Sequence, residues 1–344
     1  MKEDEKSFLS VMNGIAVIPP PVWLMRQAGR YLPEYRALRA QAGSFWAMCM
    51  DPQLAAEITL QPIRRFGFDV AVIFSDIMTI PYALGRAVRF EEEKGPSLDP
   101  VSSASQLDDK REVWRHRLEP TYETIGRVRT QLPRGVALLG FTGAPWTLAT
   151  YMAAGRGGDE QRSAKLWGYR EPTSFAALLE LVGDCVAQHL ITQIEAGADA
   201  VQIFDSWAGG LPDEAYSNWV VQPTRKVIDT VRKTHPQAKI IGFPRASSLA
   251  GYELYAAETG VDGVGVDTGV PTRWLLDFSR ATVVQGNLDP LLLVTGGKAM
   301  RKGVARILQE MRGKRFVFNL GHGVLPDTPV EHVAELVRLI RAPP

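Results

Sequence analysis

Four arginines, Arg26, Arg30, Arg36 and Arg39, lie within fourteen residues directly after an apolar run, with Glu34 the one acid between them. The formal net charge of the chain is +1, from 39 basic and 38 acidic residues. The arginines are therefore a local cluster and not part of a generally basic surface. Since guanidinium forks bind carboxylates through paired hydrogen bonds, the cluster predicts a local anion site. Ordinary surface arginines are the alternative.

Polar residues also recur where short apolar runs end. They are Arg26, Asp76, Phe141-Thr142-Gly143, Asp205-Ser206, Arg245, Asp267, Asn287/Asp289 and Gly321-His322. In a barrel of parallel strands these ends converge on one face, which carries the chemistry of such enzymes. The coincidence predicts an enzyme. Each residue also has a structural reading: Asp76 or Ser206 could cap a turn, His322 could serve a tight turn, and Tyr151 could pack its ring against the core.

Several other chemistries lack their motifs. The chain has no complete phosphate-binding loop, no H-E-x-x-H and no G-x-S-x-G, and the dinucleotide signal in "GVGVDTG" is weak. Five scattered histidines and two distant cysteines, Cys49 and Cys185, predict no metal site. The balanced charge argues against nucleic-acid binding. No secretory signal or apolar run of about 20 residues is evident, so we expect a cytoplasmic protein outside membranes.

The elements that must position these residues alternate along the chain. Eight apolar runs are typical of buried parallel strands: 21–25, 69–76, 135–143, 199–207, 239–244, 263–269, 282–289 and 315–323. Segments 174–196 and 328–341 have helical periodicity. The pattern predicts a closed (β/α)8 barrel of the TIM type, with a doubly wound open sheet as the alternative.

The longest connection, about 77–134, contains "RAVRFEEEKGPSLDPV". Its short alternating piece beside Gly95-Pro96 predicts a hairpin inserted after the second strand, within about 85–101. Repeats and linkers are absent from the sequence, so we expect one domain over 1–344, with flexible tails at about 1–7 and 342–344.

The sequence closely resembles the uroporphyrinogen decarboxylase family from about Phe8 to Val337. The segments "PVWLMRQAGRYLPEYR" and "FTGAPWTLATYM" resemble the family's signatures, and "VIFSDIMTIPYALG", "VQIFDSWAG", "QGNLDP" and "FNLGHGVLPDTPVE" extend the match. The resemblance implies a single barrel, a carboxy-lyase without cofactor, and a homodimer whose active-site clefts face one another. It also implies uroporphyrinogen III as substrate, four acetates of which become methyl groups to give coproporphyrinogen III and four CO2.

The resemblance also assigns residues. It implies Asp76 and Arg26 as catalytic, and it implies substrate contacts for Arg26, Gln27, Ala28, Gly29, Arg30, Arg39, Asp76, Phe141, Tyr151, Phe204, Ser206 and His322. The wording of "MTIPYALG" and "EEEKGPS" departs from the family's usual loops, and Arg245 occupies a variable position.

Two alternatives belong to other classes. A zinc-dependent methyltransferase on a similar barrel would need a His-x-Cys and a later Cys near strand ends, which Cys49 and Cys185 do not supply. A non-catalytic tetrapyrrole-binding protein could use the same arginine cluster, but it would not need Asp76. The proton donor, the order of decarboxylations and the dimer geometry do not follow from the sequence.

Overall fold

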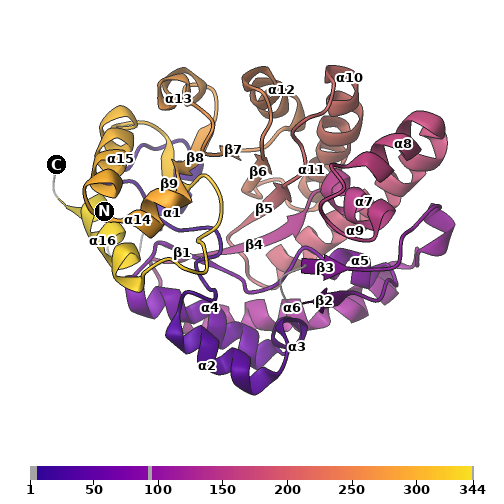
Figure 1. The fold of residues 1–344 in the computed structure, drawn as a ribbon, viewed down its shortest axis with the longest axis horizontal. Coiled ribbons are helices and arrows are strands. Elements are labelled where there is room, and N and C mark those ends of the chain that lie inside the picture. Colours follow the sequence, from indigo (N-terminus) through magenta and orange to yellow (C-terminus); the bar gives the residue numbers. More distant parts are fainter. Residues whose placement is uncertain (1–5, 92–94, 343–344) are drawn as a thin grey trace.

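Seven parallel strands form one curved sheet with helices on its outer side, in a computed structural model that describes residues 6–91 and 95–342 (Figure 1). Their order in the sheet, β1-β4-β5-β6-β7-β8-β9, is their order in the chain. The strands are β1 (Val70–Val72), β4 (Ala137–Gly143), β5 (Ala200–Asp205), β6 (Ile240–Pro244), β7 (Gly263–Gly265), β8 (Val283–Leu288) and β9 (Phe316–Leu320). Each neighbouring pair is parallel, as predicted from the apolar runs.

The first predicted strand, 21–25, is reduced to a single parallel bridge between Val22 and Phe318. The Phe318 N–H donates to the Pro21 carbonyl at 2.9 Å, and the Asp69 N–H donates to the Val22 carbonyl at 3.0 Å. This segment therefore lies between β9 and β1 and closes the ring, which rules out the open-sheet alternative. The prediction of a regular strand at 21–25 was wrong. The prolines at 19–21 lack N–H donors, and the chain turns away from the sheet after Met25.

Side chains that point into the ring form a separate apolar cluster at its N-terminal end. It contains Trp23, Val70, Ala137, Leu139, Ala200, Ile241, Val283 and Val317, together with Phe8, Val11 and Met12 from α1 (Ser7–Met12). Within the ring the Trp23 indole donates to Gln285 at 3.0 Å, and Gln285 donates to Gln202 at 3.1 Å. Helix α1 thus fills one end of the barrel, and the other end remains for the strand-end residues.

Three aspartates that precede strands connect the N-terminal ends of the barrel. Each carboxylate accepts a backbone N–H from an adjacent part of the barrel wall and also faces an arginine. Asp69 bonds Val22 N (2.8 Å) and Arg341 (3.3 Å), Asp199 bonds Leu138 N (2.7 Å) and Arg129 (2.8 Å), and Asp262 bonds Ile240 N (2.9 Å) and Arg232 (3.1 Å). Such charge-assisted bonds hold neighbouring strands in register.

Asp199 also pairs with Lys6 at 2.5 Å, and its side chain is 17% exposed. Asp199→Ala should lower the free energy of unfolding by about 2 kcal/mol, since it leaves a backbone donor and two cations without their partner. Urea denaturation followed by circular dichroism measures the change. Asp199→Asn retains an acceptor for Leu138 and should lose less, so equal losses in the two variants would contradict this role.

The remaining elements cover the sheet or extend its loops. They are α2 (Pro33–Ala42), α3 (Phe45–Met50), α4 (Pro52–Phe66), α5 (Thr79–Ala83), η1 (Ala104–Gln106), α6 (Arg111–Gln131), α7 (Pro145–Ala154), α8 (Arg162–Arg170), α9 (Pro172–Glu195), α10 (Asp213–Tyr216), η2 (Ser217–Val221), α11 (Gln222–Thr234), α12 (Leu249–Thr259), α13 (Thr272–Phe278), α14 (Pro290–Thr295), α15 (Gly297–Glu310) and α16 (Val330–Arg341). Helices α9 and α16 match the predicted segments 174–196 and 328–341.

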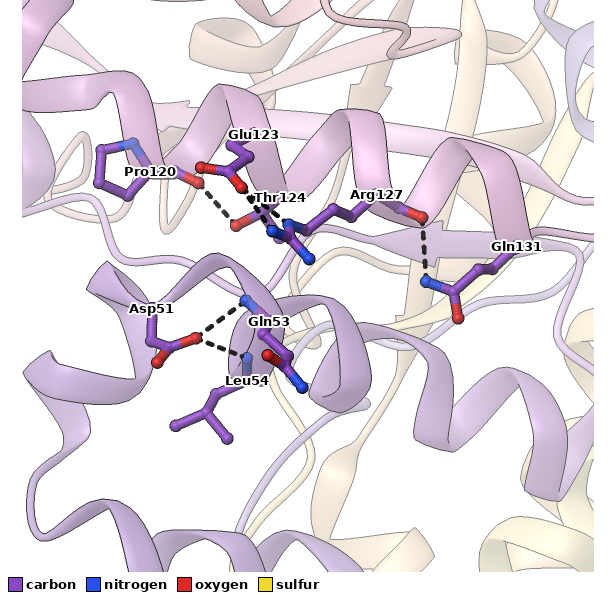
Figure 2. A network of polar contacts seen from close by, with 8 residues as sticks. All are labelled: Asp51, Gln53, Leu54, Pro120, Glu123, Thr124, Arg127 and Gln131. Atoms are coloured by element: carbon purple, nitrogen blue, oxygen red, sulfur yellow. Dashed lines mark hydrogen bonds and ion pairs between the residues drawn. The ribbon is translucent and has the colours of Figure 1, made fainter.

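Helices α4 and α6 pack against each other (Figure 2). Helix α4 also contacts β1. One Asp51 carboxylate oxygen caps α4 by accepting the Gln53 and Leu54 N–H groups at 2.9 and 3.0 Å. Inside α6, Pro120 lacks an N–H, and the Thr124 hydroxyl bonds the Pro120 carbonyl at 2.7 Å. These bonds stabilise the helices beneath β1, the strand that leads to Asp76.

The hairpin predicted after the second strand is present. Strands β2 (Arg89–Glu91) and β3 (Gly95–Ser97) pair antiparallel, and Ser97 forms a further bridge with Arg156. Residues 92–94 between them lie outside the described chain. Of the expected tails, 1–5 and 343–344 also lie outside it, while Ser7 already begins α1.

Helix α9 is the one helix of the described residues that is long and apolar enough to cross a membrane, with a mean hydropathy of 1.3 over 18 residues. It packs on β4 and against α6, α7, α8 and α11. Buried residues including Phe175, Val182 and Leu190 account for its apolar character. We therefore interpret α9 as a core helix of the barrel wall.

Candidate active site

Segment 26–30 leaves the barrel wall through a tight turn. The Gln27 N–H donates to the Leu24 carbonyl at 3.0 Å, so Met25 and Arg26 are the central residues. Arg26 has a φ of 60°, and Met25 is not among the residues with positive φ. This is the pattern of a type II turn, whose second central position favours glycine. The exposed Arg26 side chain is thus placed at the barrel mouth at a cost in backbone strain.

Gln27 faces the opposite way from Arg26. Its side chain is 1% exposed, accepts the Leu24 N–H at 3.1 Å and donates to the Val70 carbonyl at 2.9 Å. Its main-chain oxygen accepts the Tyr31 hydroxyl at 2.7 Å. Gln27 was predicted to contact substrate, but the structure engages its amide in the barrel wall. Its geometry is that of a support for the turn.

The rest of this segment lies near the surface. Ala28 and Gly29 are half-buried, and Arg30 is exposed. A Cβ on Gly29 would lie 3.2 Å from the Arg26 carbonyl oxygen, so a larger residue would crowd the turn. The segment therefore offers a guanidinium at each end and little bulk between them.

Asp76 follows β1 at the barrel mouth. One carboxylate oxygen accepts the Met78 N–H at 2.8 Å, and the other makes no hydrogen bond within the described part of the chain. Burial raises the pKa of Asp76 from 3.8 to about 6, although the Met78 N–H and the Arg26 guanidinium both act to lower it. Asp76 is thus both a turn cap, which was the structural alternative, and a carboxylate with a second oxygen available for another partner.

Tyr151 and Ser206 come from neighbouring elements that are tied together. Tyr151 lies on α7, and its ring is 6.2 Å from that of Trp207, the residue after Ser206. The Trp207 N–H donates to the Thr147 hydroxyl at 3.1 Å, and its carbonyl accepts the Trp146 indole at 2.8 Å. Burial raises the pKa of Tyr151, with a smaller increase from Asp76 and an opposing effect of Arg26. Tyr151 is therefore close to both catalytic candidates.

An aromatic wall lines one side of the mouth. Phe141 on β4 and Phe204 on β5 are half-buried, with ring centroids 5.5 Å apart in an edge-to-face arrangement. Phe204 continues to Phe243 on β6 at 5.9 Å. All three occupy inward-facing positions of adjacent strands, as the alternation along a strand requires. They provide an apolar surface next to the charged groups.

His322 lies in the loop after β9 and is only partly exposed. Burial lowers its pKa to about 4, aided by Arg26 and Arg245 and opposed by Asp267. Its Nδ1 accepts the Gly323 N–H at 2.6 Å, so the neutral ring carries its proton on Nε2. At neutral pH His322 is therefore an uncharged hydrogen-bond donor.

His322→Phe should raise KM for an anionic substrate about tenfold, because a hydrogen bond to a charged group is lost. His322→Asn keeps an N–H donor and should show a smaller increase. Steady-state kinetics between pH 6 and 8 tests both, and the histidine should add no titration in this range. A ring that NMR shows to titrate near pH 7 would contradict the neutral state.

Arg30 and Arg39 lie beside the buried Tyr35 on α2. Burial raises the pKa of Tyr35, and both arginines act to lower it, Arg39 through its side chain's hydrogen bond. Arg39 is half-buried and lies on the same helix as Tyr35. The structure therefore groups Arg30 with Arg39 around Tyr35.

Four of the predicted residues thus converge. Arg26 lies within electrostatic reach of Asp76, Tyr151 and His322, from four separate elements. Arg245, which acts on His322, was noted as a strand-end residue but was not among the predicted substrate contacts. That set also omitted two supporting residues: Thr147, whose hydroxyl accepts the Trp207 N–H, and Asn319, whose side-chain oxygen accepts the Met25 N–H. Arg245 directly follows the predicted strand 239–244, which was a usable signal. Thr147 and Asn319 act through long-range contacts that spacing does not reveal.

Two cavities lie elsewhere. One of about 570 Å³ is lined by Lys239, Asp262 and Arg315 near the N-terminal ends of β6 to β8, and one of about 560 Å³ lies between α9 and α11. Neither is lined by a predicted site residue. Within residues 6–91 and 95–342 no group of three or more His, Cys, Asp or Glu side chains is arranged to hold a metal ion.

Comparison with known proteins identifies a family. The model of the family "Uroporphyrinogen decarboxylase (URO-D)" matches residues 3–343. Proteins named uroporphyrinogen decarboxylase from Mesorhizobium japonicum and a Chelativorans species are 52% and 50% identical over 334 and 337 residues. The matches cover 97% of both chains in the first case and 98% of both in the second.

Solved structures share the architecture at lower identity. A methyltransferase from Methanosarcina mazei superposes with a TM-score of 0.81 at 17% identity, covering 98% of both chains. A B12-independent methionine synthase from a Shewanella species gives a TM-score of 0.54 at 12% identity, covering 84% of this chain and 85% of that one. At these identities the likeness shows the barrel fold alone.

Proposed function

Because this chain belongs to the uroporphyrinogen decarboxylase family, we propose that it converts uroporphyrinogen III to coproporphyrinogen III. The reaction removes CO2 from four acetate side chains. The structural observation that carries the proposal is that Arg26 influences both Asp76 and His322 at one barrel mouth. One ligand could thereby donate pyrrole N–H groups to Asp76 and accept hydrogen bonds from Arg26 and His322 through its carboxylates.

The cationic residues suit the carboxylates of the substrate. Uroporphyrinogen carries eight, four acetates and four propionates, and guanidinium forks bind such groups through paired hydrogen bonds. Arg26 and Arg30 are assigned to grip them, with Arg39 in support. Tyr151 and Ser206 contribute neutral donors. His322 contributes its Nε2–H, since its Nδ1 is already occupied by Gly323.

The aromatic wall suits the macrocycle itself. Phe141 and Phe204 present apolar faces beside the charged residues, where the pyrrole rings would lie. The main chain of Ala28 and Gly29 is assigned to the edge of the substrate. Gln27 is assigned to hold the turn, because its amide is bonded to Leu24 and Val70.

Asp76 is assigned to the centre of the reaction. Four inward-pointing pyrrole N–H groups form a ring of donors that its second carboxylate oxygen can accept. Protonation of a pyrrole α-carbon makes that ring cationic, and the cation takes up the electron pair released when the acetate loses CO2. The resulting methylene group is protonated and the ring proton leaves, which yields a methyl group. A fixed negative charge beneath the ring stabilises the cation by several kcal/mol in a site with little water.

The substrate serves as its own electron sink in this mechanism, so no cofactor is assigned. Arg26 is assigned to binding and to the placement of charge. A guanidinium holds its proton tightly and is a poor proton donor at neutral pH. The acid is therefore a substrate carboxyl, a water molecule or another group at the mouth.

Anaerobic incubation with uroporphyrinogen III tests the activity. Separation of the products should show hepta-, hexa- and pentacarboxylate intermediates and finally the tetracarboxylate. Tight binding of the substrate without loss of any carboxylate would instead support a non-catalytic tetrapyrrole-binding protein. Stoichiometric zinc with loss of activity on chelation would support the methyltransferase alternative.

A homodimer with facing clefts and a cytoplasmic location are part of the same proposal. The family resemblance is the basis for the dimer, and equilibrium sedimentation should give twice the 38.0 kDa of one chain. Both cysteines are free and buried, which suits a reducing compartment.

A further inference from the structure

Arg26 has a backbone conformation that is unfavourable for a residue with a side chain. A φ of 60° at the second central position of a turn is readily adopted by glycine and disfavoured by other residues. Such strain persists only where surrounding contacts determine the conformation. The contacts that hold Arg26 should therefore be as important as Arg26 itself.

The main chain on either side of Arg26 is fixed by three segments. Within the turn, Gln27 bonds Leu24 and Val70. The Met25 N–H donates to the Asn319 side-chain oxygen at 3.0 Å, and the Met25 carbonyl accepts the Val324 N–H at 2.8 Å. The residue before Arg26 is thus held from one side by β9 and from the other by the loop that carries His322.

Asn319 is fully buried on β9, and its side-chain oxygen also accepts the Leu320 N–H at 2.8 Å. Its amide nitrogen has no hydrogen-bond partner within the described part of the chain. The side chain is thus used as an acceptor toward Met25 and its own strand. An unpaired buried donor is unfavourable. Asparagine at this position is therefore explained by the need for its side-chain oxygen as an acceptor for Met25 and Leu320.

The side chain of Arg26 lies directly on the backbone of Gly323. A Cβ at Gly323 would be 2.4 Å from Cδ and 2.7 Å from Cγ of Arg26. Gly323 does not have a positive φ, so the turn does not require glycine there for its backbone conformation. Glycine is required for space. The stem of Arg26 packed on Gly323 carries the guanidinium toward His322 and Asp76.

We propose that Asn319 and Gly323 are positioning residues for Arg26: Asn319 fixes the main chain of its strained turn, and Gly323 provides the surface on which its side chain lies. Only the predicted effect of these residues on turnover rests on the proposed function. The physical coupling between Gly323 and Arg26 can be measured without substrate.

A double-mutant cycle of thermal unfolding tests the coupling. Gly323→Ala should lower the Tm by several degrees in the wild-type chain, because the new methyl group meets the Arg26 stem. In an Arg26→Ala chain the same substitution should lower it much less. Gly140→Ala is the matched control, because its Cβ would lie 2.3 Å from Gln193 Oε1, far from Arg26. Its effect should be equal in both backgrounds, and an equally additive result for Gly323 overturns the proposal.

Kinetics with uroporphyrinogen III supply the functional test. Gly323→Ala should reduce kcat/KM about tenfold or more in the wild-type chain and cause no further loss when Arg26 is already Ala. Asn319→Leu should reduce kcat/KM similarly, and Asn319→Asp, which keeps the acceptor for Met25, should restore most of it. Equal losses for Leu and Asp at 319 would overturn its part.

The two proposals fail in different ways. If the wild-type chain releases no CO2 from uroporphyrinogen but the Tm cycle is non-additive, the proposed activity is wrong and the positioning of Arg26 by Gly323 stands. If the chain is active and the cycle is additive, the activity stands and this inference is wrong. Gly323→Ala alone could fail to fold because its methyl group meets the Arg26 stem. In that case Gly323→Ser should still fold in the Arg26→Gly chain, where the stem is absent. Failure of this double variant to fold as well would overturn the proposal.

Discussion

Asp76→Asn is expected to lower kcat for uroporphyrinogen decarboxylation about 100- to 1,000-fold while the folded protein becomes more stable. Asn has the same shape and can still accept the Met78 N–H, so the turn should persist. What disappears is the negative charge that, in the proposed mechanism, lies beneath the pyrrole nitrogens and stabilises the cationic intermediate. Quantifying CO2 and carboxylated porphyrins under single-turnover conditions separates this loss from any change in binding.

The gain in stability follows from the direction of the pKa shift. Asp76 has a pKa of about 6 in the folded chain, against 3.8 ordinarily. Because the folded state binds the proton more tightly, the contribution of Asp76 to stability is full below about pH 4 and is lost as the pH rises through 6. At pH 7 the ionised group therefore lowers the free energy of unfolding by about 3 kcal/mol, which Asn should recover. Urea denaturation at pH 7 and pH 5 should show this difference shrinking at the lower pH.

The same shift predicts the pH dependence of the activity. The wild-type kcat/KM should decrease below about pH 6, as the carboxylate takes up a proton and its charge is lost. The residual activity of Asp76→Asn should lack this acid limb. Asp109→Asn, at an exposed carboxylate, is the control and should change neither stability nor rate. An unaltered kcat in Asp76→Asn would contradict the electrostatic role directly.

The fold could be predicted well because its signal is distributed along the chain. Buried parallel strands leave uninterrupted apolar runs, and seven of the eight predicted runs contain a regular strand. The exception, 21–25, satisfies the same pattern, but a strand also needs paired N–H groups on both sides. Prolines before Val22 and the turn after Met25 leave room for a single bridge. The apolar character of 21–25 alone could not show that this segment forms only one bridge.

The candidate site was predictable in its outward-facing residues and less so in their supports. A motif such as 26–30 assigns all five residues together, whereas the turn sends Arg26 to the mouth and Gln27 into the wall. Asn319 meets Met25 across almost the full length of the chain. Such contacts depend on the closed ring, so no local spacing indicates them.

Arg26 should separate activity from stability even more clearly than Asp76 does. Arg26→Gly and Arg26→Ala both remove the guanidinium, and each should lower kcat/KM at least 100-fold, about 3 kcal/mol, since paired bonds to a substrate carboxylate are lost. Arg26→Lys keeps the charge without the fork and should retain intermediate activity. Steady-state kinetics under anaerobic conditions measures all three variants.

The stabilities of the same variants should run opposite to the usual order. At an ordinary position Gly is less stable than Ala by about 0.5–1 kcal/mol. At a φ of 60° the penalty of about 1–2 kcal/mol for a left-handed residue applies to Ala and not to Gly. Arg26→Gly should therefore be more stable than Arg26→Ala by about 1 kcal/mol, measured by urea denaturation, although both lose activity to a similar extent. If Arg26→Ala were the more stable of the two, the backbone at residue 26 would carry no strain, and the argument from its φ of 60° would be wrong.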